Sequence, residues 1–322
     1  MTTYTTNRPA VEISIVIPAF NESQNISVIY QELENIFRSN DSTWELIFID
    51  DGSTDNTWSE IERLHGIDQS VCGLRLSRNF GHQYALFAGL NAAHGNAVIS
   101  MDADLQHPPS IVPELISEWR KGNKIVNTIR EDAANLSFFK KITSKIFYRV
   151  FSYLSGVKLE QGMADFRLID RQVLDQILQF KEEGLFLRGL VRWVGYPSTS
   201  ITFQCADRFS GVSKYTTYRM LKFAWHGISS FSIVPLRIGI AIGILTSLLS
   251  LYFLLEAIYA NYVLGTTVPG WTSTIGVISL LFGILFIFLG LLGEYIGRIL
   301  VQVRGRPLYL VSKTVGVDDE ND

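Results

Sequence analysis

Short apolar runs alternate with amphipathic segments through the first hundred residues of the chain. The apolar runs have the length of buried strands, and the segments between them have helical periodicity or helix-start residues. The predicted strands are Glu12–Ala19, Trp44–Asp50, Val71–Leu76 and Ala97–Met101, and the predicted helices are Ser23–Arg38, Asp55–Leu64 and Tyr84–Ala93. Strands that alternate with helices indicate an α/β domain with a largely parallel sheet.

Two longer apolar runs lie near the C-terminus, at Ile238–Leu255 and Ile275–Leu292. Each has 18 residues and no charge, which is close to the length that crosses a bilayer core. No Lys or Arg lies between Arg237 and Arg298, whereas both flanks carry several. By the positive-inside rule, both flanks are cytoplasmic and the loop Asn261–Ser273 is outside. The pattern predicts a multi-pass protein of the plasma (inner) membrane, with the large N-terminal domain and both termini cytoplasmic.

Two further segments, Phe139–Tyr153 and Tyr218–Phe231, are apolar on one side and basic on the other. Such a helix either lies in the membrane interface or packs on the domain as an ordinary surface helix. The first segment favours neither alternative, whereas the second leads directly into a membrane run and favours the interface. The predicted organisation is a cytoplasmic α/β domain at 1–210, a juxtamembrane amphipathic helix at 211–235, a two-helix transmembrane domain at 236–299 and a cytoplasmic tail at 300–322.

Composition adds little to this picture. The 322 residues carry a net charge of −3, and we expect no nucleic acid among the partners. The two cysteines, Cys72 and Cys205, have no metal-type spacing. We interpret them as buried thiols in a reducing compartment.

Asp102-Ala103-Asp104 directly follows the fourth predicted strand. Two carboxylates at this spacing can hold Mg²⁺ or Mn²⁺ and leave positions open for substrate phosphate oxygens. The metal would offset the charge of a departing nucleoside diphosphate. An Asp-x-Asp sequence alone is weak, because Asp pairs also cap turns, but the preceding strand and the turn from Gln106 to Pro109 strengthen the interpretation.

Two other carboxylate-bearing loops follow predicted strands, at Pro18–Glu22 and Asp50–Ser53. Each has a structural interpretation as a helix start or a capped turn. Asp51 could instead accept hydrogen bonds from a base or a ribose. Ligands of α/β sheets bind at the carboxyl ends of the strands, so three such loops together favour a binding site.

Six motifs extend these observations along most of the chain. They are IPAFNE at Ile17–Glu22, DDGS at Asp50–Ser53, SRNFGHQYALFAG at Ser77–Gly89, DADLQ at Asp102–Gln106, DFR at Asp165–Arg167 and RFSGVSKY at Arg208–Tyr215. As a set they resemble the inverting GT-A glycosyltransferases. The subgroup is that of the polyprenyl-phosphate glycosyltransferases, which includes dolichol-phosphate mannose synthases and bactoprenol glucosyltransferases. The resemblance implies a Rossmann-like GT-A domain with amphipathic interface helices and two C-terminal transmembrane helices.

The resemblance also implies roles for individual residues. The nucleotide-sugar would contact Pro18, Phe20, Glu22, Asp51, Asp102 and Ala103. The metal and diphosphate would contact Asp102, Asp104 and Gln106, with Asp104 and Asp165 as catalytic residues. The lipid phosphate would contact Arg130, Lys140, Ser144, Arg208 and Lys214. For Arg208 and Lys214, ordinary positive-inside charge is the alternative, but cations in a loop just before a membrane helix also suit a phosphate at the bilayer surface, which we favour.

Asp165 has two possible roles. In related bacterial enzymes the matching Asp is a proposed catalytic base. A phosphate monoester already carries about 1.5 to 2 negative charges at neutral pH, so it needs little deprotonation before it attacks the sugar. We therefore predict that Asp165 orients the acceptor or the sugar, with base catalysis as the second possibility.

The sequence as a whole predicts inverting transfer of a hexose from a nucleotide-sugar, with UDP-glucose preferred, to undecaprenyl or another polyprenyl phosphate. One alternative is a glycosyltransferase with a non-lipid acceptor, and another is an inactive membrane scaffold or glycolipid translocator. Processive synthases carry Gln-x-x-Arg-Trp, but here Gly189 replaces the Gln, and we interpret Arg192 and Trp193 as helix and core residues. The resemblance further implies a homo-oligomer, such as a tetramer.

Overall fold

The computed structural model describes residues 4–5, 11–38, 42–131, 162–180, 182, 186–204 and 270–319, with scattered positions between 239 and 263. The chain divides into two compact units. The first comprises residues 1–152, 157–219 and 307–322, and the second comprises residues 153–156 and 220–306. The predicted domain boundaries stay a prediction, because the segment 211–235 lies outside the described residues.

The first unit is built on an eight-stranded mixed sheet with the order β8-β6-β7-β5-β2-β3-β4-β9. In chain order these strands are β2 Ile13–Ala19, β3 Trp44–Asp50, β4 Val71–Leu76, β5 Ala97–Ser100, β6 Ile125–Glu131, β7 Met163–Asp170, β8 Ser198–Gln204 and β9 Val311–Val315. The four strands β5, β2, β3 and β4 are parallel. Strand β7 is antiparallel to β5 and β6, and β9 is antiparallel to β4. A separate two-stranded ribbon pairs β1 Tyr4–Thr5 with β10 Asp318–Asp319.

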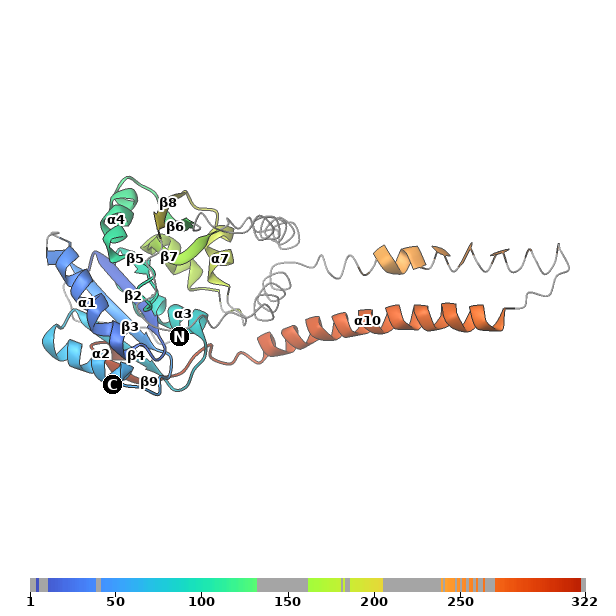
Figure 1. Ribbon diagram of the computed structural model, residues 1–322, viewed down its shortest axis with the longest axis horizontal. Coiled ribbons are helices and arrows are strands. Elements are labelled where there is room, and N and C mark those ends of the chain that lie inside the picture. The colour runs from blue at the N-terminus through green and yellow to red at the C-terminus, as the bar shows by residue number, and fades with distance from the viewer. Residues whose placement is uncertain are drawn as a thin grey trace. The chain divides into compact units, whose positions relative to one another are not determined.

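Helices cover both faces of the sheet (Figure 1). In the first unit they are α1 Ser23–Arg38, α2 Thr57–Ile67, α3 His82–Ala92, the short 3₁₀ helix η1 Pro109–Ile111, α4 Val112–Arg120, α6 Arg171–Ile177 and α7 Leu187–Trp193. The predicted α/β alternation is confirmed, and the predicted strands Trp44–Asp50 and Val71–Leu76 have the observed bounds. Short apolar runs that are bounded by turn residues are typical of buried strands, which explains the agreement.

The two faces of the central strands are packed differently. Ile13, Ile15 and Ile17 of β2 belong to the main apolar cluster with residues of α1, α2 and α4. Val16 of β2 and Ile49 of β3 instead lie under α3. A Cβ on Gly89 of α3 would come within 2.9 Å of both side chains, so a glycine is needed for this close approach. This packing fixes the N-terminus of α3 above the carboxyl ends of the parallel strands.

The second unit contains the long helix α10 Trp271–Val303. Within α10, Leu280–Val303 is long and apolar enough to cross a membrane, and none of this stretch is buried inside the structure. The second predicted span, Ile275–Leu292, lies within α10. The first predicted span, Ile238–Leu255, is described only at scattered positions, and the amphipathic segments Phe139–Tyr153 and Tyr218–Phe231 lie outside the described residues. A second membrane helix therefore stays a prediction.

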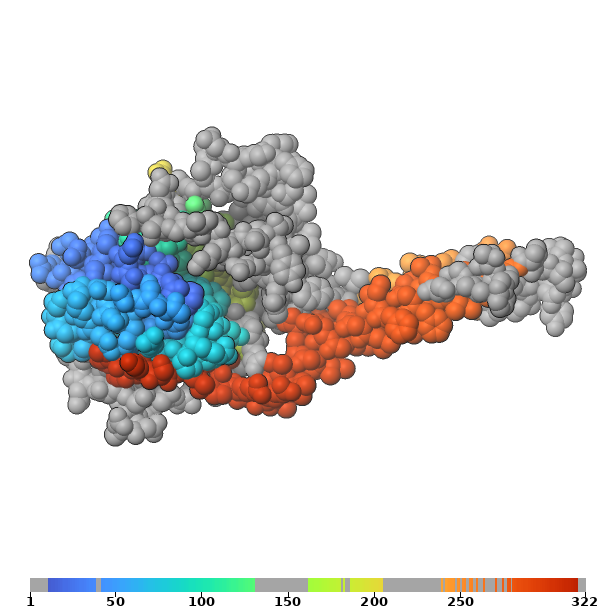
Figure 2. Space-filling view, turned by 60° about the horizontal axis from the view of Figure 1, so that its bottom comes forward, coloured from blue at the N-terminus to red at the C-terminus, as the bar shows by residue number. Residues whose placement is uncertain are grey.

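From residue 307 on, the C-terminal segment, predicted to be a cytoplasmic tail, belongs to the first unit, and in Figure 2 it lies in dark red against the blue segments of that unit. Strand β9 pairs with β4, and the Ser312 hydroxyl donates to the carbonyl oxygens of Arg75 and Leu76. The backbone N–H of Ser77 donates to Leu310 O at 2.8 Å. The chain that follows α10 therefore supports the end of β4 and the start of the loop that leads to α3.

A buried polar cluster lies at the opposite, amino end of the strands. Glu45 accepts from the Ser14 hydroxyl at 2.6 Å and from the His94 N–H at 2.8 Å, and His94 Nδ1 lies 3.7 Å from Oε2. Burial alone would raise the pKa of Glu45, but the contacts with His94 and Ser14 lower it below the usual value. The cluster joins β2, β3 and the loop before β5.

Glu45→Ala should lower the apparent Tm of the purified protein by about 5 to 10 °C, because it leaves buried donors without an acceptor. A carboxylate with a lowered pKa stabilises above its unfolded value of about 4.3, and this contribution is lost as the pH falls through the folded value. The difference in apparent Tm between Glu45→Ala and the wild type should therefore be largest near pH 7 and should become smaller only below about pH 4.

Glu34→Ala is the matched control, because Glu34 of α1 is partly exposed and forms an i,i+4 pair with Arg38, whose side chain is 73% exposed. Such pairs contribute about 0.5 kcal/mol or less. Equal Tm shifts for the two variants would contradict the role of the Glu45 cluster.

Candidate functional site

The loops after β2 and β3 are tied to each other by hydrogen bonds. The N–H of Asn21 donates to the Ser53 hydroxyl at 2.9 Å, and the N–H of Thr54 donates to Asn21 Oδ1 at 2.9 Å. The N–H of Glu22 donates to Thr57 Oγ1 at 3.0 Å. The predicted nucleotide-sugar segment Pro18–Glu22 therefore shares one edge of the sheet with Asp50–Ser53.

Asp51 is 3% exposed and holds the loop that precedes α3. One carboxylate oxygen accepts from the N–H of Phe80 at 2.7 Å, and the other accepts from the N–H of Gly81 at 2.9 Å. Burial raises the pKa of Asp51, and these two hydrogen bonds oppose the shift. Asp51 thus has a clear structural role in this conformation, whereas its predicted contact with the nucleoside stays a prediction.

Gly52 allows the loops after β3 and β4 to approach closely. Its φ is +70°, and a Cβ there would lie 2.5 to 2.9 Å from backbone atoms of Arg78 and Asn79. Asp50, on the other side of Asp51, accepts from the N–H of Ser53 and pairs with Arg75 Nε at 3.2 Å. The sequence DDGS therefore packs the loops after β3 and β4 together through one fixed turn.

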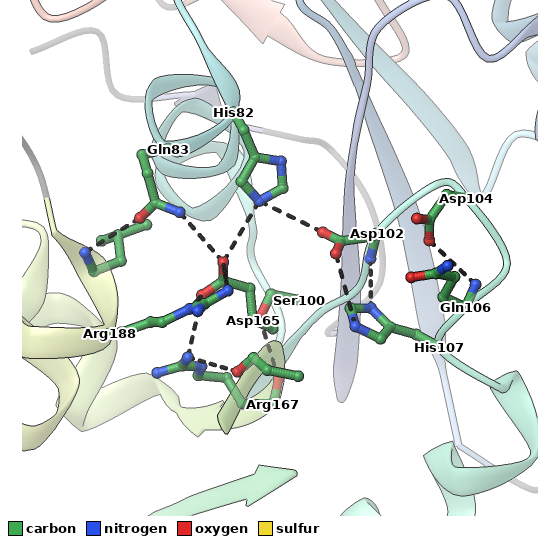
Figure 3. A network of polar contacts seen from close by, with 12 residues as sticks. His82, Gln83, Ser100, Asp102, Asp104, Gln106, His107, Asp165, Arg167 and Arg188 are labelled. Atoms are coloured by element: carbon green, nitrogen blue, oxygen red, sulfur yellow. Dashed lines mark hydrogen bonds and ion pairs between the residues drawn. The ribbon is translucent and has the colours of Figure 1, made fainter. Parts of the chain in front are cut away.

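Asp102 follows β5 and is oriented by His107 (Figure 3). His107 Nδ1 accepts from the backbone N–H of Asp102 at 3.0 Å, so the proton of the neutral ring lies on Nε2. His107 Nε2 is 3.7 Å from Asp102 Oδ2. The His107 ring stacks on Phe166, with 5.2 Å between the ring centroids. The imidazole thus links the Asp102 turn to β7.

The turn after Asp102 places further oxygen atoms at the same edge of the sheet. Asp104 Oδ1 accepts from the N–H of Gln106 at 3.1 Å. Leu105, between them, has a φ of 59°, which is rare for a residue with a bulky side chain. Among the described residues, Asn21 is the other non-glycine residue with a left-handed backbone. Both residues lie in loops at the carboxyl ends of strands, where functional sites concentrate such strain.

Asp165 of β7 is 5% exposed and is surrounded by donors from three elements (Figure 3). Arg188 of α7 binds both carboxylate oxygens, with Nε–Oδ1 and Nη2–Oδ2 distances of 2.8 Å. Arg167 Nη2 is 3.2 Å from Oδ1, and Gln83 Nε2 of α3 is 3.3 Å from Oδ2. Burial alone would raise the pKa of Asp165, but Arg188, His82 and Arg167 hold it well below its usual range. The carboxylate is therefore ionised at neutral pH.

His82 lies between the two acidic groups. Its Nε2 is 3.5 Å from Asp102 Oδ1 and 3.7 Å from Asp165 Oδ2, and its side chain is 42% exposed. Desolvation lowers the pKa of His82, but the neighbouring carboxylates of Asp165 and Asp102 outweigh it and raise the pKa above the usual value. One imidazole at the N-terminus of α3 thus links Asp102 with Asp165.

The structure brings some of the predicted site residues together and leaves others unplaced. Asp102 and Asp165 share the His82 contact, and the remaining carboxylate loops lie at the same edge of the sheet. Arg130, predicted to bind lipid phosphate, is an exposed residue near the end of β6. The four other residues of that set lie outside the described residues: Lys140, Ser144, Arg208 and Lys214.

The sequence did not reveal Arg188, which lies on α7 and 23 positions after Asp165. The available signal was indirect, because a buried carboxylate requires a compensating cation. The prediction of Trp193 as a core residue is wrong, since Trp193 is 61% exposed. Trp193 ends α7, and its ring meets Phe180 edge-on with 5.4 Å between the centroids.

The side chains at the Asp102 turn fit the predicted metal in their chemistry. Asp102, Asp104 and Gln106 are partly exposed and offer oxygen ligands, which Mg²⁺ and Mn²⁺ prefer. Within the described part of the chain, no three His, Cys, Asp or Glu residues form a candidate metal cluster. One or two carboxylates are the usual protein contribution where substrate phosphates complete the coordination of Mg²⁺.

Comparison with known proteins agrees with the fold. The glycosyl transferase family 2 profile matches residues 14–178. An uncharacterised glycosyltransferase, YkcC, from Bacillus subtilis is 40% identical over 96% of both chains. A prophage-derived bactoprenol glucosyl transferase from Shigella flexneri is 38% identical over 94% of this chain and 98% of the relative.

A solved structure of glucosyl-3-phosphoglycerate synthase from Mycobacterium tuberculosis is 18% identical. It covers 70% of this chain and 84% of its own, with a TM-score of 0.46. The profile match and the near full-length relatives show that the chain belongs to glycosyl transferase family 2. The predicted Rossmann-like GT-A fold is confirmed, with a mixed rather than largely parallel sheet.

Gly52→Ala should strain the turn that packs Asp51 against the loop after β4. The left-handed backbone alone costs about 1 to 3 kcal/mol, and the close contact with Arg78 and Asn79 adds to it. We expect a lower apparent Tm and faster amide exchange at residues 77–81.

Gly66→Ala is the matched control, because Gly66 lies in α2 with no atom near its Cβ position. That change should stabilise the protein by about 0.5 to 1 kcal/mol. Unchanged exchange at residues 77–81 in Gly52→Ala would contradict the packing role of Gly52.

Proposed function

We propose that the protein transfers a hexose from a nucleotide-sugar to a polyprenyl phosphate, with inversion at the anomeric carbon. The observation that carries the proposal is the facing pair of acidic groups, Asp102 and Asp165, joined through His82 at the carboxyl edge of the sheet. The near full-length likeness to the Shigella flexneri bactoprenol glucosyl transferase supports a lipid acceptor and a glucose donor.

The donor would lie against the loops after β2, β3 and β5. Pro18, Phe20, Glu22 and Asp51 would line the nucleoside side, and Asp102 and Ala103 the sugar-diphosphate side. Asp102, Asp104 and Gln106 would hold Mg²⁺ or Mn²⁺, which when bound stabilises the charge that develops on the departing diphosphate. His107 keeps the Asp102 turn in place, because it accepts a hydrogen bond from the Asp102 N–H and its ring stacks on Phe166.

Asp165 would orient the acceptor or the sugar rather than remove a proton. Its carboxylate already accepts hydrogen bonds from Arg188, Arg167 and Gln83, which makes it a weak base. A phosphate monoester acceptor of about −1.5 to −2 charge is a sufficient nucleophile without proton abstraction. Alignment of the two reacting atoms is then the principal contribution of the protein at this position.

The acceptor would reach the site from a membrane surface. The unburied apolar stretch Leu280–Val303 of α10 suits a bilayer, and a second C-terminal span would return the chain to the same side. Arg130 together with Lys140, Ser144, Arg208 and Lys214 would hold the lipid phosphate. The catalytic domain and both termini would be cytoplasmic, and UDP-glucose and undecaprenyl phosphate are the preferred substrates. A homo-oligomer, such as a tetramer, belongs to the same proposal.

Purified full-length protein should transfer radiolabelled sugar to undecaprenyl phosphate and give a chloroform-extractable product. A panel of UDP- and GDP-sugars, with Mg²⁺ or Mn²⁺, identifies the donor, and UDP-glucose is expected to be used. EDTA should abolish the product, and Asp102→Ala should lower the rate about 100-fold or more, since it removes a charge-stabilising group at the leaving diphosphate. The anomeric configuration of the product, measured by NMR, should be opposite to that of the donor.

Asp175→Ala is the control, because Asp175 is an exposed residue of α6 with 58% of its side chain accessible. It should retain the wild-type rate. Bound nucleotide without any lipid product would favour a different acceptor or an inactive scaffold. A product that forms equally well without polyprenyl phosphate would favour the non-lipid acceptor.

Asp165→Asn tests the role of the buried carboxylate. Because the pKa of Asp165 is held well below its usual range, its ionisation does not change between pH 6 and pH 8. If it orients the acceptor, the variant should lose activity by the same factor across that interval. A loss that is larger at pH 6 than at pH 8 would instead support proton abstraction, because more of the acceptor phosphate still carries a proton at pH 6.

A further inference from the structure

The Asp165–Arg188 contact has the geometry of an orienting clamp. The guanidinium of Arg188 meets both carboxylate oxygens at 2.8 Å, one through Nε and one through Nη2. Such a two-point contact fixes the plane of a carboxylate as well as its position, which a single ion pair does not. The Arg188 side chain is 34% exposed, whereas the Asp165 side chain is 6% exposed. The clamp therefore joins a partly exposed arginine of α7 to a buried carboxylate.

Gln83 connects the same carboxylate to the start of α7. Its Nε2 donates to Asp165 Oδ2 at 3.3 Å, and its Oε1 accepts from the backbone N–H of Leu187 at 3.3 Å. The N–H groups in the first turn of a helix have no partner within the helix, and Phe186 offers no side-chain cap. The amide of Gln83 therefore satisfies the first N–H of α7 and holds that helix beside α3 and Asp165.

Arg167 cannot take over the orienting role of Arg188. It lies two residues from Asp165 on the same strand, and its Nη2 is shared between Asp165 Oδ1 and the Ala164 carbonyl oxygen. Its guanidinium reaches only one carboxylate oxygen, at 3.2 Å. Burial lowers the pKa of Arg167 to about 10, which leaves it charged at neutral pH. Arg167 therefore compensates the charge of Asp165 but, through one contact to one oxygen, does not by itself fix the plane of the carboxylate.

We propose that Arg188 and Gln83 are positioning residues that set the orientation of the Asp165 carboxylate, so that α7 determines how the acceptor is aligned. This inference rests on the proposed sugar transfer. Loss of Arg188 would leave the charge of Asp165 compensated by Arg167, so the protein would fold and bind donor. It would lose the fixed direction of the carboxylate, and with it the alignment of the reacting atoms.

Arg188→Ala should lower kcat about 100-fold with the KM for the nucleotide-sugar changed less than about threefold, because misplacement by about 1 Å has that effect on rate. Guanidinium chloride, added well below denaturing concentrations, should restore part of kcat, since the Arg188 position opens to solvent. Arg188→Lys should lose nearly as much as Arg188→Ala, because an ammonium group cannot form the two-point contact. Gln83→Ala should show a smaller loss in the same direction.

The double variant Arg188→Ala with Asp165→Asn separates positioning from independent action. If Arg188 acts through Asp165, the double variant loses no more activity than Asp165→Asn alone. If the double variant instead lost activity by the product of the two single-variant factors, the proposal would be overturned. Arg63→Ala is the matched control, because Arg63 lies on α2 and pairs with Glu60 at the surface. It should leave kcat unchanged and show no response to guanidinium.

Amide hydrogen exchange of the full-length protein gives a readout that does not depend on sugar transfer. Arg188→Ala and Asp165→Asn should each accelerate exchange in residues 187–193, and the double variant should add nothing further. Unchanged exchange in that segment would overturn the clamp even if wild type proves inactive. Absence of transfer by wild type with the expected exchange pattern would overturn the proposed function alone.

Discussion

Burial of carboxylate charge at the carboxyl edge of the sheet is the constraint on which the candidate site depends. Asp50, Asp51 and Asp165 are 0%, 3% and 5% exposed. A buried charge is tolerated only where donors replace the lost water. Each of the three carboxylates recruits donors from a different part of the chain: Arg75 for Asp50, the backbone of the Phe80–Gly81 loop for Asp51, and Arg188 for Asp165. The requirement to compensate charge thus determines which loops lie side by side.

This constraint also explains why one face of the sheet changes character along the strand order. Under α3 that face is apolar, with Val16 and Ile49 around Gly89. Ser100 of β5 lies beside Val16 of β2, and on its other side beside Arg167 of β7. Arg167 in turn lies beside Asn127 of β6, so these residues are on the same face of the sheet. Apolar packing fixes α3 rigidly, and the polar part beside it receives His82 and Gln83 from the first turn of α3. Helix α3 is therefore held by apolar packing, while its first turn presents His82 and Gln83 to the polar part of the sheet face.

The fold was more predictable from the sequence than the site. Strands such as Trp44–Asp50 are encoded by consecutive apolar residues, and the Asp102-Ala103-Asp104 turn follows directly from its strand, so local patterns suffice. The partners of Asp165 are not local, because Gln83 and Arg188 are 82 and 23 positions away. Strand β9 was missed for a related reason: Val311–Val315 has a burial pattern that is mostly exposed, and only the edge of β4, far away in the sequence, makes it a strand. Charge compensation and edge pairing are tertiary properties that no short motif reports.

The different exposure of the acidic groups suggests a division of work between them. Asp102 and Asp104 are partly exposed, and a carboxylate that is to meet a metal and a diphosphate must keep oxygen atoms available for exchange. Asp165 is enclosed and bound at both oxygens, which suits a group whose direction matters more than its availability. His82 joins the two groups, and its raised pKa favours the cationic form between two anions. In the proposed transfer the phosphate acceptor brings its own negative charge, so such a site would gain more from fixed geometry and positive compensation than from a base. The clamp of Arg188 on Asp165 is the arrangement that this requirement favours.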